Sequence, residues 1–155
     1  MEMRRAKQSI VASFAAVEVA LLVALLGELE DVMAEMAPDD PATQRLFPAA
    51  FPDDAAATTQ FRELTEQSLQ QERRDRYEQC RAELPAAGGQ VVITSQMSGR
   101  WLVVLNDMRL ALGTRLGVTA EPMADAETDD SDRGARALYD WLTGVQDQLL
   151  SQVMR

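Results

Sequence analysis

Apolar residues in the stretch 100–117 recur at helical spacing, and we expect the fold to be organised around this stretch. Leucines and valines extend the apolar surface around most of its circumference, and a helix that is apolar nearly all round is usually buried. Thr94 or Ser95 supplies an N-cap and Gly117 a left-handed C-terminal residue. One face carries residues spaced by four, three, four and four: Trp101, Leu105, Met108, Leu112 and Leu116.

Three further segments show helical periodicity, residues 15–37, 55–84 and 133–154. In the second of these, residues 70–76 contain no apolar side chain, so we expect a solvated charged face there, stabilised by pairs three and four residues apart. The apolar positions of that second helix fall mostly along one face and are expected to pack inward: Phe61, Leu64, Leu69, Tyr77, Cys80 and Leu84.

Two short segments have the β-branched composition of strands, residues 9–14 (SIVASF) and 90–94 (QVVIT). A lone strand leaves its backbone groups unpaired, so we expect these two strands to pair with each other. Together the elements predict a mainly α fold, a four-helix bundle carrying a small two-stranded β-sheet. The length of 155 residues predicts a single helical domain, residues 1–155.

Two connecting segments differ in composition. Residues 38–54 contain four of the six prolines, and we predict one short helical turn at 42–46. Residues 121–132 contain six acids and no base, which is typical of a flexible acidic loop. That loop lacks the glycine and the ligand spacing of a calcium-binding loop. Three apolar side chains of the proline-rich segment are expected to tuck under the bundle: Leu46, Phe47 and Phe51.

An apolar run from Ile10 to Gly27 follows three basic residues and could be interpreted as a signal peptide or membrane anchor. Glu18 lies in the middle of this run, and a charge is costly in hydrocarbon. The apolar pattern also continues to Met36 among acidic residues. We therefore favour an amphipathic helix of a protein with no membrane segment, and we expect a cytoplasmic location.

Charge and composition narrow the function classes. The chain has 25 acids, 15 bases and no histidine, for a net charge of −10. Such a chain repels phosphate backbones, so direct nucleic-acid binding is disfavoured and a protein partner with a basic face is favoured. The absence of histidine removes the commonest general base and metal ligand. We predict no catalytic residue, no cofactor and no metal site, and hence no enzyme.

Few residues could still carry chemistry. Asp107 and Asp140 lie on the two most apolar helices and could do acid–base work if they met in a pocket with Arg109. The alternative is that each carboxylate forms a structural ion pair with Arg109, Arg115 or Arg136. Residues 113–117 (GTRLG) lack the pattern of a phosphate-binding loop, and Gly113 there is better explained by close packing.

The lone cysteine, Cys80, lies on the apolar face of the second helix. A free cysteine in that position usually behaves as a small inert hydrophobe. Reactivity would require exposure and a neighbouring positive charge, which Arg76 or Arg81 could provide. Cys80 is thus the one candidate redox residue.

Three phrases of the sequence resemble an actinobacterial family of domains of unknown function. Residues 105–119 (LNDMRLALGTRLGVT) are close to the family phrase LNDLRLALGTRLGVT, and residues 137–142 (ALYDWL) are similar to its C-terminal phrase. Residues 46–54 (LFPAAFPDD) resemble its LLPDAYPDD. The resemblance covers about residues 9 to 150. Seven polar residues of the first two phrases could fix the bundle or meet a partner: Asn106, Asp107, Arg109, Thr114, Arg115, Tyr139 and Asp140.

The resemblance implies a cytoplasmic regulatory protein, since the family includes an oxidative-stress regulator of actinomycetes. It further implies modulation of transcription by binding an alternative sigma factor. Redox sensing through a cysteine pair does not carry over, because this chain has a single cysteine. Two alternatives stay open beside the regulatory hypothesis. One is a small-ligand binder or enzyme that uses Asp107, Arg109 and Asp140, and the other is a structural homodimer.

Overall fold

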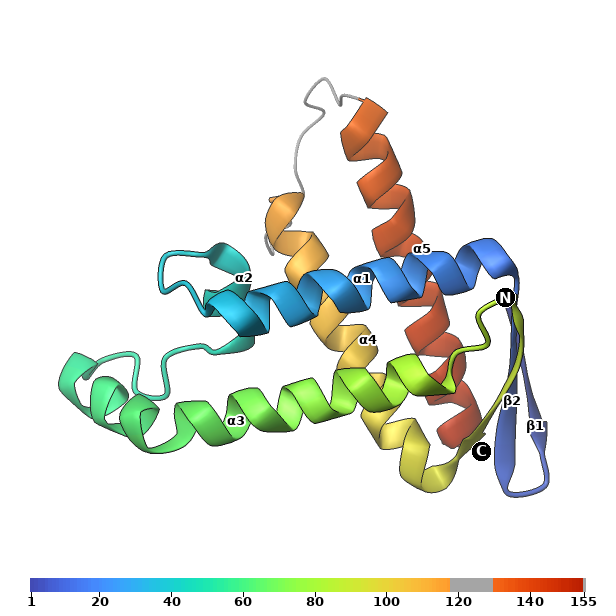
Figure 1. Ribbon diagram of the computed structural model, residues 1–155, viewed down its shortest axis with the longest axis horizontal. Helices are drawn as coiled ribbons and strands as arrows, with labels where there is room; N and C mark the ends of the chain where they lie inside the picture. Colours follow the sequence, from blue (N-terminus) through green and yellow to red (C-terminus); the bar gives the residue numbers. More distant parts are fainter. Residues whose placement is uncertain (118–129, 155) are drawn as a thin grey trace.

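A computed structural model describes residues 1–117 and 130–154 of the chain (Figure 1). The described residues form five helices and three strands, a mainly helical fold with a small sheet. Most of the predicted acidic loop at 121–132 lies outside the described residues; its last three residues begin the final helix. The elements in chain order are β1 (Glu2–Ala6), β2 (Ser9–Phe14), α1 (Ala16–Glu35), α2 (Pro41–Leu46), α3 (Ala55–Glu83), β3 (Gly89–Thr94), α4 (Ser95–Arg115) and α5 (Asp130–Val153).

The sheet has three antiparallel strands in the order β1-β2-β3, where two strands were predicted. The predicted pairing of β2 with β3 is confirmed, with Ser9 opposite Thr94. The strand that the pattern did not predict is β1 (EMRRA), which forms a hairpin with β2 through a turn containing Lys7 at φ 56°. Its charged side chains suit an edge strand, because charge discourages pairing with other chains. Because β1 is mostly polar, its sequence lacks the alternation of apolar and polar residues that marks a strand.

The helices do not form a four-helix bundle, which corrects the predicted architecture. Helices α1 and α3 lie side by side and cross over the pair formed by α4 and α5 (Figure 1). The short helix α2 packs against α4 as a fifth helical element. Hydrophobic periodicity shows which face of a helix is buried, but it carries no information on the angle at which two helices cross.

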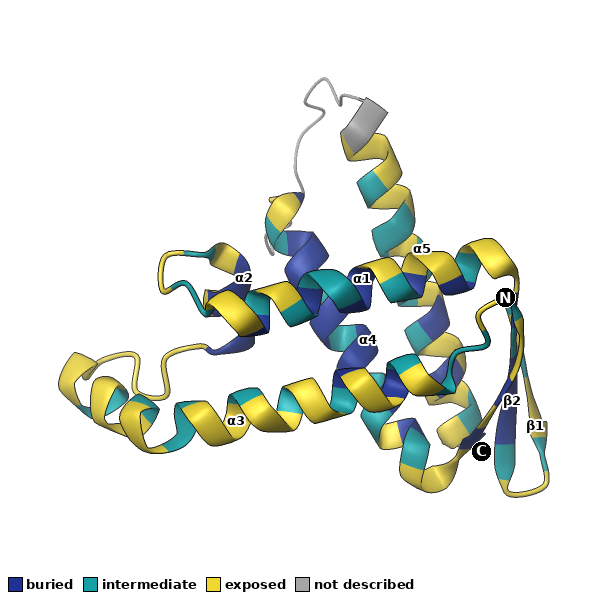
Figure 2. Ribbon diagram, in the orientation of Figure 1, coloured by how far each residue is buried: buried dark blue, intermediate teal, exposed yellow. Residues whose placement is uncertain are grey.

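The core is centred on α4, as the sequence predicts (Figure 2). Trp101, Leu105 and Met108 of its apolar face are all at most 2% exposed. The predicted N-cap is confirmed, because the Thr94 hydroxyl accepts the backbone N–H of Met97 at 3.4 Å. Gly117 follows the helix with φ 60°, the left-handed conformation that glycine adopts without strain.

Helix α3 is buried only toward its C-terminal end (Figure 2). Its fully buried residues are Tyr77 and Cys80, although the helix begins more than twenty residues earlier, at Ala55. Asp54 caps it by accepting the Ala57 N–H at 2.9 Å. The N-terminal half projects past the other helices (Figure 1). The prediction that Phe51 tucks under the bundle is wrong, since 47% of this side chain is exposed.

Candidate functional site

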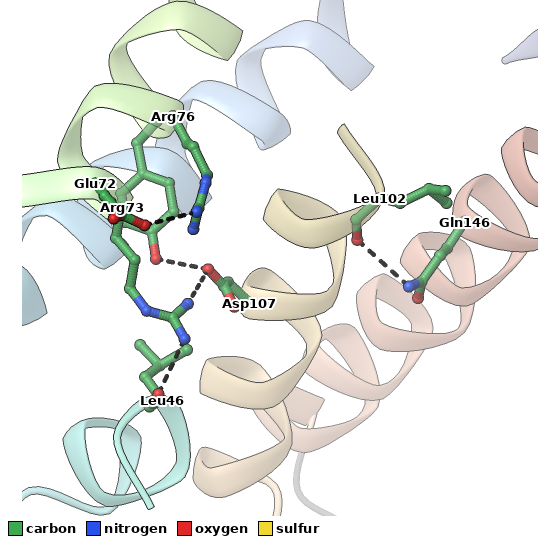
Figure 3. A network of polar contacts seen from close by, with 8 residues as sticks. Leu46, Glu72, Arg73, Arg76, Leu102, Asp107 and Gln146 are labelled. Carbon is green, nitrogen blue, oxygen red and sulfur yellow. Dashed lines mark hydrogen bonds and ion pairs between the residues drawn. The ribbon is translucent and has the colours of Figure 1, made fainter. Parts of the chain in front are cut away.

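Asp107 lies in the middle of α4 and is 2% exposed. Its carboxylate accepts a hydrogen bond of 2.9 Å from the Tyr77 hydroxyl and forms an ion pair with Arg73, both from α3. Arg73 also donates to the Leu46 carbonyl at the end of α2, at 3.0 Å (Figure 3). The ion pair of Asp107 with Arg73 therefore connects three helices, α4, α3 and α2.

The partners of Asp107 correct two predictions. Its ion pair is with Arg73, where Arg109, Arg115 and Arg136 were the expected candidates. Arg73 belongs to the segment 70–76, which was predicted to be a solvated face. That prediction holds for most of the segment, where Glu72 and Arg76 form a pair four residues apart. Arg73 is the exception, and Gln70 and Arg74 also contact another helix, because both donate to the Met33 carbonyl at the end of α1. Contacts across 34 residues leave no local signal in the sequence.

The two side chains that donate to Asp107, Tyr77 and Arg73, both have raised pKa values. Burial, and then the charge of Asp107, raise the pKa of the Tyr77 hydroxyl well above its usual value. Burial lowers the pKa of the Arg73 guanidinium, but the hydrogen bond and charge of Asp107 outweigh it and leave a net increase. Tyr77 is thus a neutral donor and Arg73 a cation at any physiological pH. The arrangement serves as a structural clamp.

Arg109 faces away from Asp107 and connects α4 to α5. It donates to the Gln146 side chain at 2.6 Å and to the Tyr139 hydroxyl at 3.3 Å. Its guanidinium also lies 5.2 Å from the centre of the Tyr139 ring, a cation–π contact. The Gln146 amide donates in turn to the Leu102 carbonyl at 3.5 Å (Figure 3). Arg109 and Tyr139, which belong to the two motifs at residues 105–119 and 137–142, are therefore in contact.

The remaining candidate residues lie apart. The Thr114 hydroxyl donates to a carbonyl of its own helix at 2.6 Å. Arg115 pairs with Glu28 of α1 at 2.8 Å on the surface. Asn106 is half-buried and Asp140 is exposed on α5. The structure does not bring Asp107, Arg109 and Asp140 into one site, because the first bonds to α3 and the second to α5.

Cys80 is fully buried against α4. Burial raises the pKa of its thiol to about 12, although a hydrogen bond from Arg100 lowers it in part. At this end of α3, Glu83 forms an ion pair with Arg100 and accepts a hydrogen bond of 2.7 Å from the Trp101 indole N–H. Of the two conditions for reactivity, exposure is absent, and the neighbouring charge of Arg100 does not offset the effect of burial on the pKa of the thiol.

An exposed apolar surface covers the N-terminal half of α3 and the segment before it. Its members are Phe51, Phe61, Leu64 and Leu69, and Leu64 is 78% exposed. We call these four residues the α3 apolar surface. The rings of Phe51 and Phe61 pack edge to face with centroids 6.1 Å apart. The sequence placed the three helical members on an apolar face but predicted that this face would be buried.

A pocket of about 210 Å³ opens next to the α3 apolar surface. Phe61 and Leu69 form its wall on α3, while Leu46 and Phe47 close the opposite side. The guanidinium of Arg73 lies 5.1 Å from the centre of the Phe47 ring, so the pocket borders the Asp107 network. Concave apolar surfaces with a few polar groups are the usual form of a binding site.

Two kinds of site are missing from the described part of the chain. Within residues 1–117 and 130–154, no group of three acidic or thiol side chains is placed to hold a metal ion. Among the same residues, no helix combines the length and apolarity that crossing a membrane requires. The α3 apolar surface and its pocket combine exposed apolar side chains with a concave wall, which is the usual form of a binding site.

Comparison with known proteins identifies the family. A relative from Mycobacterium leprae, named "Putative oxidative stress regulator AosR", is 26% identical over 130 residues. That match covers 76% of this chain and 60% of the relative, so the chain corresponds to about three-fifths of the relative's length. No solved structure matches the chain. The family described as a domain of unknown function, DUF2017, matches residues 1–153, and the chain therefore belongs to the DUF2017 family.

Proposed function

We propose that this protein is a non-enzymatic cytoplasmic regulator that acts through protein–protein contacts. The α3 apolar surface is the observation that carries the proposal. A monomer gains nothing from exposing Phe61 and Leu64 to water on a projecting helix, and exposed apolar patches commonly mark interaction sites. The candidate polar residues support the same view, since Asp107 and Arg109 are used in contacts between helices of this chain.

The partner that we propose is an alternative sigma factor, so that binding modulates transcription under oxidative stress. The stress regulator name of the M. leprae relative supports the regulatory part of this proposal. The net charge of −10 supports a partner with a basic face. Regulation through oxidation of Cys80 is not part of the proposal, because the thiol is buried with a raised pKa.

The test is a binding experiment with the tagged chain as bait. We expect extracts of oxidatively stressed cells to yield a sigma factor or polymerase subunit, and the purified sigma factor to bind the purified chain directly. Phe61→Ser should lose this binding. Val17→Ser serves as the matched control, since Val17 is an exposed apolar residue on α1. Cys80→Ala should bind as the unchanged chain does.

Recovery of no sigma factor and no polymerase subunit would refute the transcriptional role. Light scattering provides the second check, because a homodimer could also cover the α3 apolar surface. We expect a species of 17.1 kDa. A species of twice this mass that reverts to the monomer in Phe61→Ser would replace the regulatory proposal with that of a structural homodimer.

A further inference from the structure

The pocket beside α3 is continuous with a longer apolar surface. Phe61 and Leu69 belong both to the pocket wall and to the exposed surface, and Leu64, which lies between them on α3, is exposed outside the pocket. A small molecule that filled the pocket would leave Leu64 and Phe51 in water. An elongated occupant, such as a helix laid along α3, covers the pocket and the surface together.

A carboxylate in the pocket lacks a counterion. Glu66 is half-buried in the pocket wall, three residues before Leu69. Within the described residues it has no hydrogen bond and no ion pair. Of the two arginines of the pocket, Arg73 pairs with Asp107, while Arg62 donates to the Phe47 carbonyl at 3.1 Å and forms no ion pair with Glu66. The Glu66 carboxylate is therefore open to a charge-assisted hydrogen bond from a cation of a partner.

We propose that this pocket docks a basic amphipathic helix of a partner protein. A large apolar side chain of that helix enters the pocket between Phe61 of α3 and Phe47 on the opposite wall, and a lysine or arginine one turn away pairs with Glu66. Residues three or four apart lie on one face of a helix, so one partner helix can present both groups. This inference rests on the proposed function in taking the occupant to be a protein segment.

The experiment uses two synthetic peptides of about five helical turns. Both carry the same apolar face of leucines around one phenylalanine, and they differ only in having lysine or glutamate on the flanks. Binding of each fluorescently labelled peptide to the whole chain is measured by anisotropy. We expect the lysine peptide to bind and the glutamate peptide to bind much more weakly.

Single substitutions locate the site. We expect Phe61→Ser or Leu69→Gln to weaken binding of the lysine peptide about tenfold, the scale of a central apolar contact. Glu66→Gln should weaken it about threefold, as expected for a partly exposed ion pair. Glu63→Gln is the matched control, because Glu63 is exposed on the same helix and does not line the pocket. It should leave the affinity unchanged.

Two results with these variants would overturn the inference. Equal losses in Glu66→Gln and Glu63→Gln would show that the lysine peptide responds only to the net negative charge. Unchanged binding by Phe61→Ser and Leu69→Gln would place the contact elsewhere. If neither peptide binds, while the sigma factor binds the chain and is lost in Phe61→Ser, the inference fails and the proposed function stands. If the peptide results hold but no sigma factor is captured, the docking surface stands and the transcriptional role fails.

Discussion

Asp107 is a charged residue in the protein interior, although an ionised carboxylate is more stable in water. A carboxylate in a protein interior loses its hydration, and an ion pair only partly restores the lost free energy. Here the Tyr77 hydroxyl, at 2.9 Å, and the Arg73 guanidinium share its negative charge. The same guanidinium holds the end of α2 through the Leu46 carbonyl. The network thus fixes one arrangement of three helices that apolar packing alone would leave less specific.

Asp107→Asn should lower the free energy of unfolding by about 3 kcal/mol, because it leaves Arg73 half-buried without its anion. Tyr77→Phe should lower it by about 1 kcal/mol, since it removes one donor. Urea unfolding followed by circular dichroism measures both. The double variant Arg73→Met with Asp107→Leu is the control, and it should recover most of the loss because no charge is left buried. A loss of under about 1 kcal/mol in Asp107→Asn would contradict a structural role for the pair.

Cys80 should make the protein sensitive to alkali. Burial raises the pKa of its thiol from 9.0 to about 12. Because the folded-state pKa is the higher one, the stability that this thiol contributes is complete below pH 9 and is lost as the pH rises toward 12. The urea midpoint should therefore fall across this range. In Cys80→Ala the urea midpoint should fall less steeply with pH, and Tyr77 should account for part of the fall that remains. An identical fall in the variant and the unchanged chain would be evidence against a buried thiol.

Local stability differs along the chain, and the two halves of α3 differ in how many buried contacts they make. Its C-terminal part is anchored by the buried Tyr77 and Cys80, and by Arg81, which binds Glu30 of α1 at 2.8 Å. Its N-terminal half has no fully buried residue. Local stability follows buried contacts, so the two halves of α3 should open with different free energies.

Hydrogen exchange can measure this difference. We expect amides of residues 59–68 to exchange much faster than those of residues 77–83, because only the latter lie on buried contacts. Binding of a partner helix along α3 should slow exchange in residues 59–68. Uniform protection along α3 in the isolated chain would show that its N-terminal half is covered in solution.

The loop before β3 passes close to the backbone of another element. Gly88 has φ 80°, and a Cβ at this position would lie 2.7 Å from the backbone nitrogen of Ala16, at the start of α1. Gly88→Ala should therefore lower the free energy of unfolding by about 2 kcal/mol, from backbone strain and the clash. Gly99→Ala is the control within α4, where a Cβ has nothing within 4 Å. It should stabilise the protein by about 0.5–1 kcal/mol in thermal unfolding.

On the scale of the whole molecule, charge is the dominant property. The net charge of −10 on 155 residues implies self-repulsion within the folded chain. We expect added sodium chloride, from about 20 to 200 mM, to raise the melting temperature by screening that repulsion. Differential scanning calorimetry measures the shift. A lower melting temperature in salt would show that surface pairs such as Arg115 with Glu28 outweigh the repulsion.

The apolar pattern by itself determined the long helices and the strands β2 and β3, although not the charged edge strand β1. The face of Trp101 in α4 is buried as its spacing predicts. The caps at Asp54 and Thr94 are also local, because a cap joins residues only three apart. Motifs determined the family in the same way, since they are linear strings of sequence.

Only the tertiary structure decided how the elements meet and what they leave uncovered. The partner of Asp107 proved to be Arg73, which lies 34 residues earlier. Phe61 and Leu69 have the spacing of core residues, yet they stay 42% and 39% exposed, because α3 extends past the helices beside it. Spacing along a helix shows that residues share a face, but the length and crossing of the neighbouring helices determine whether that face is buried.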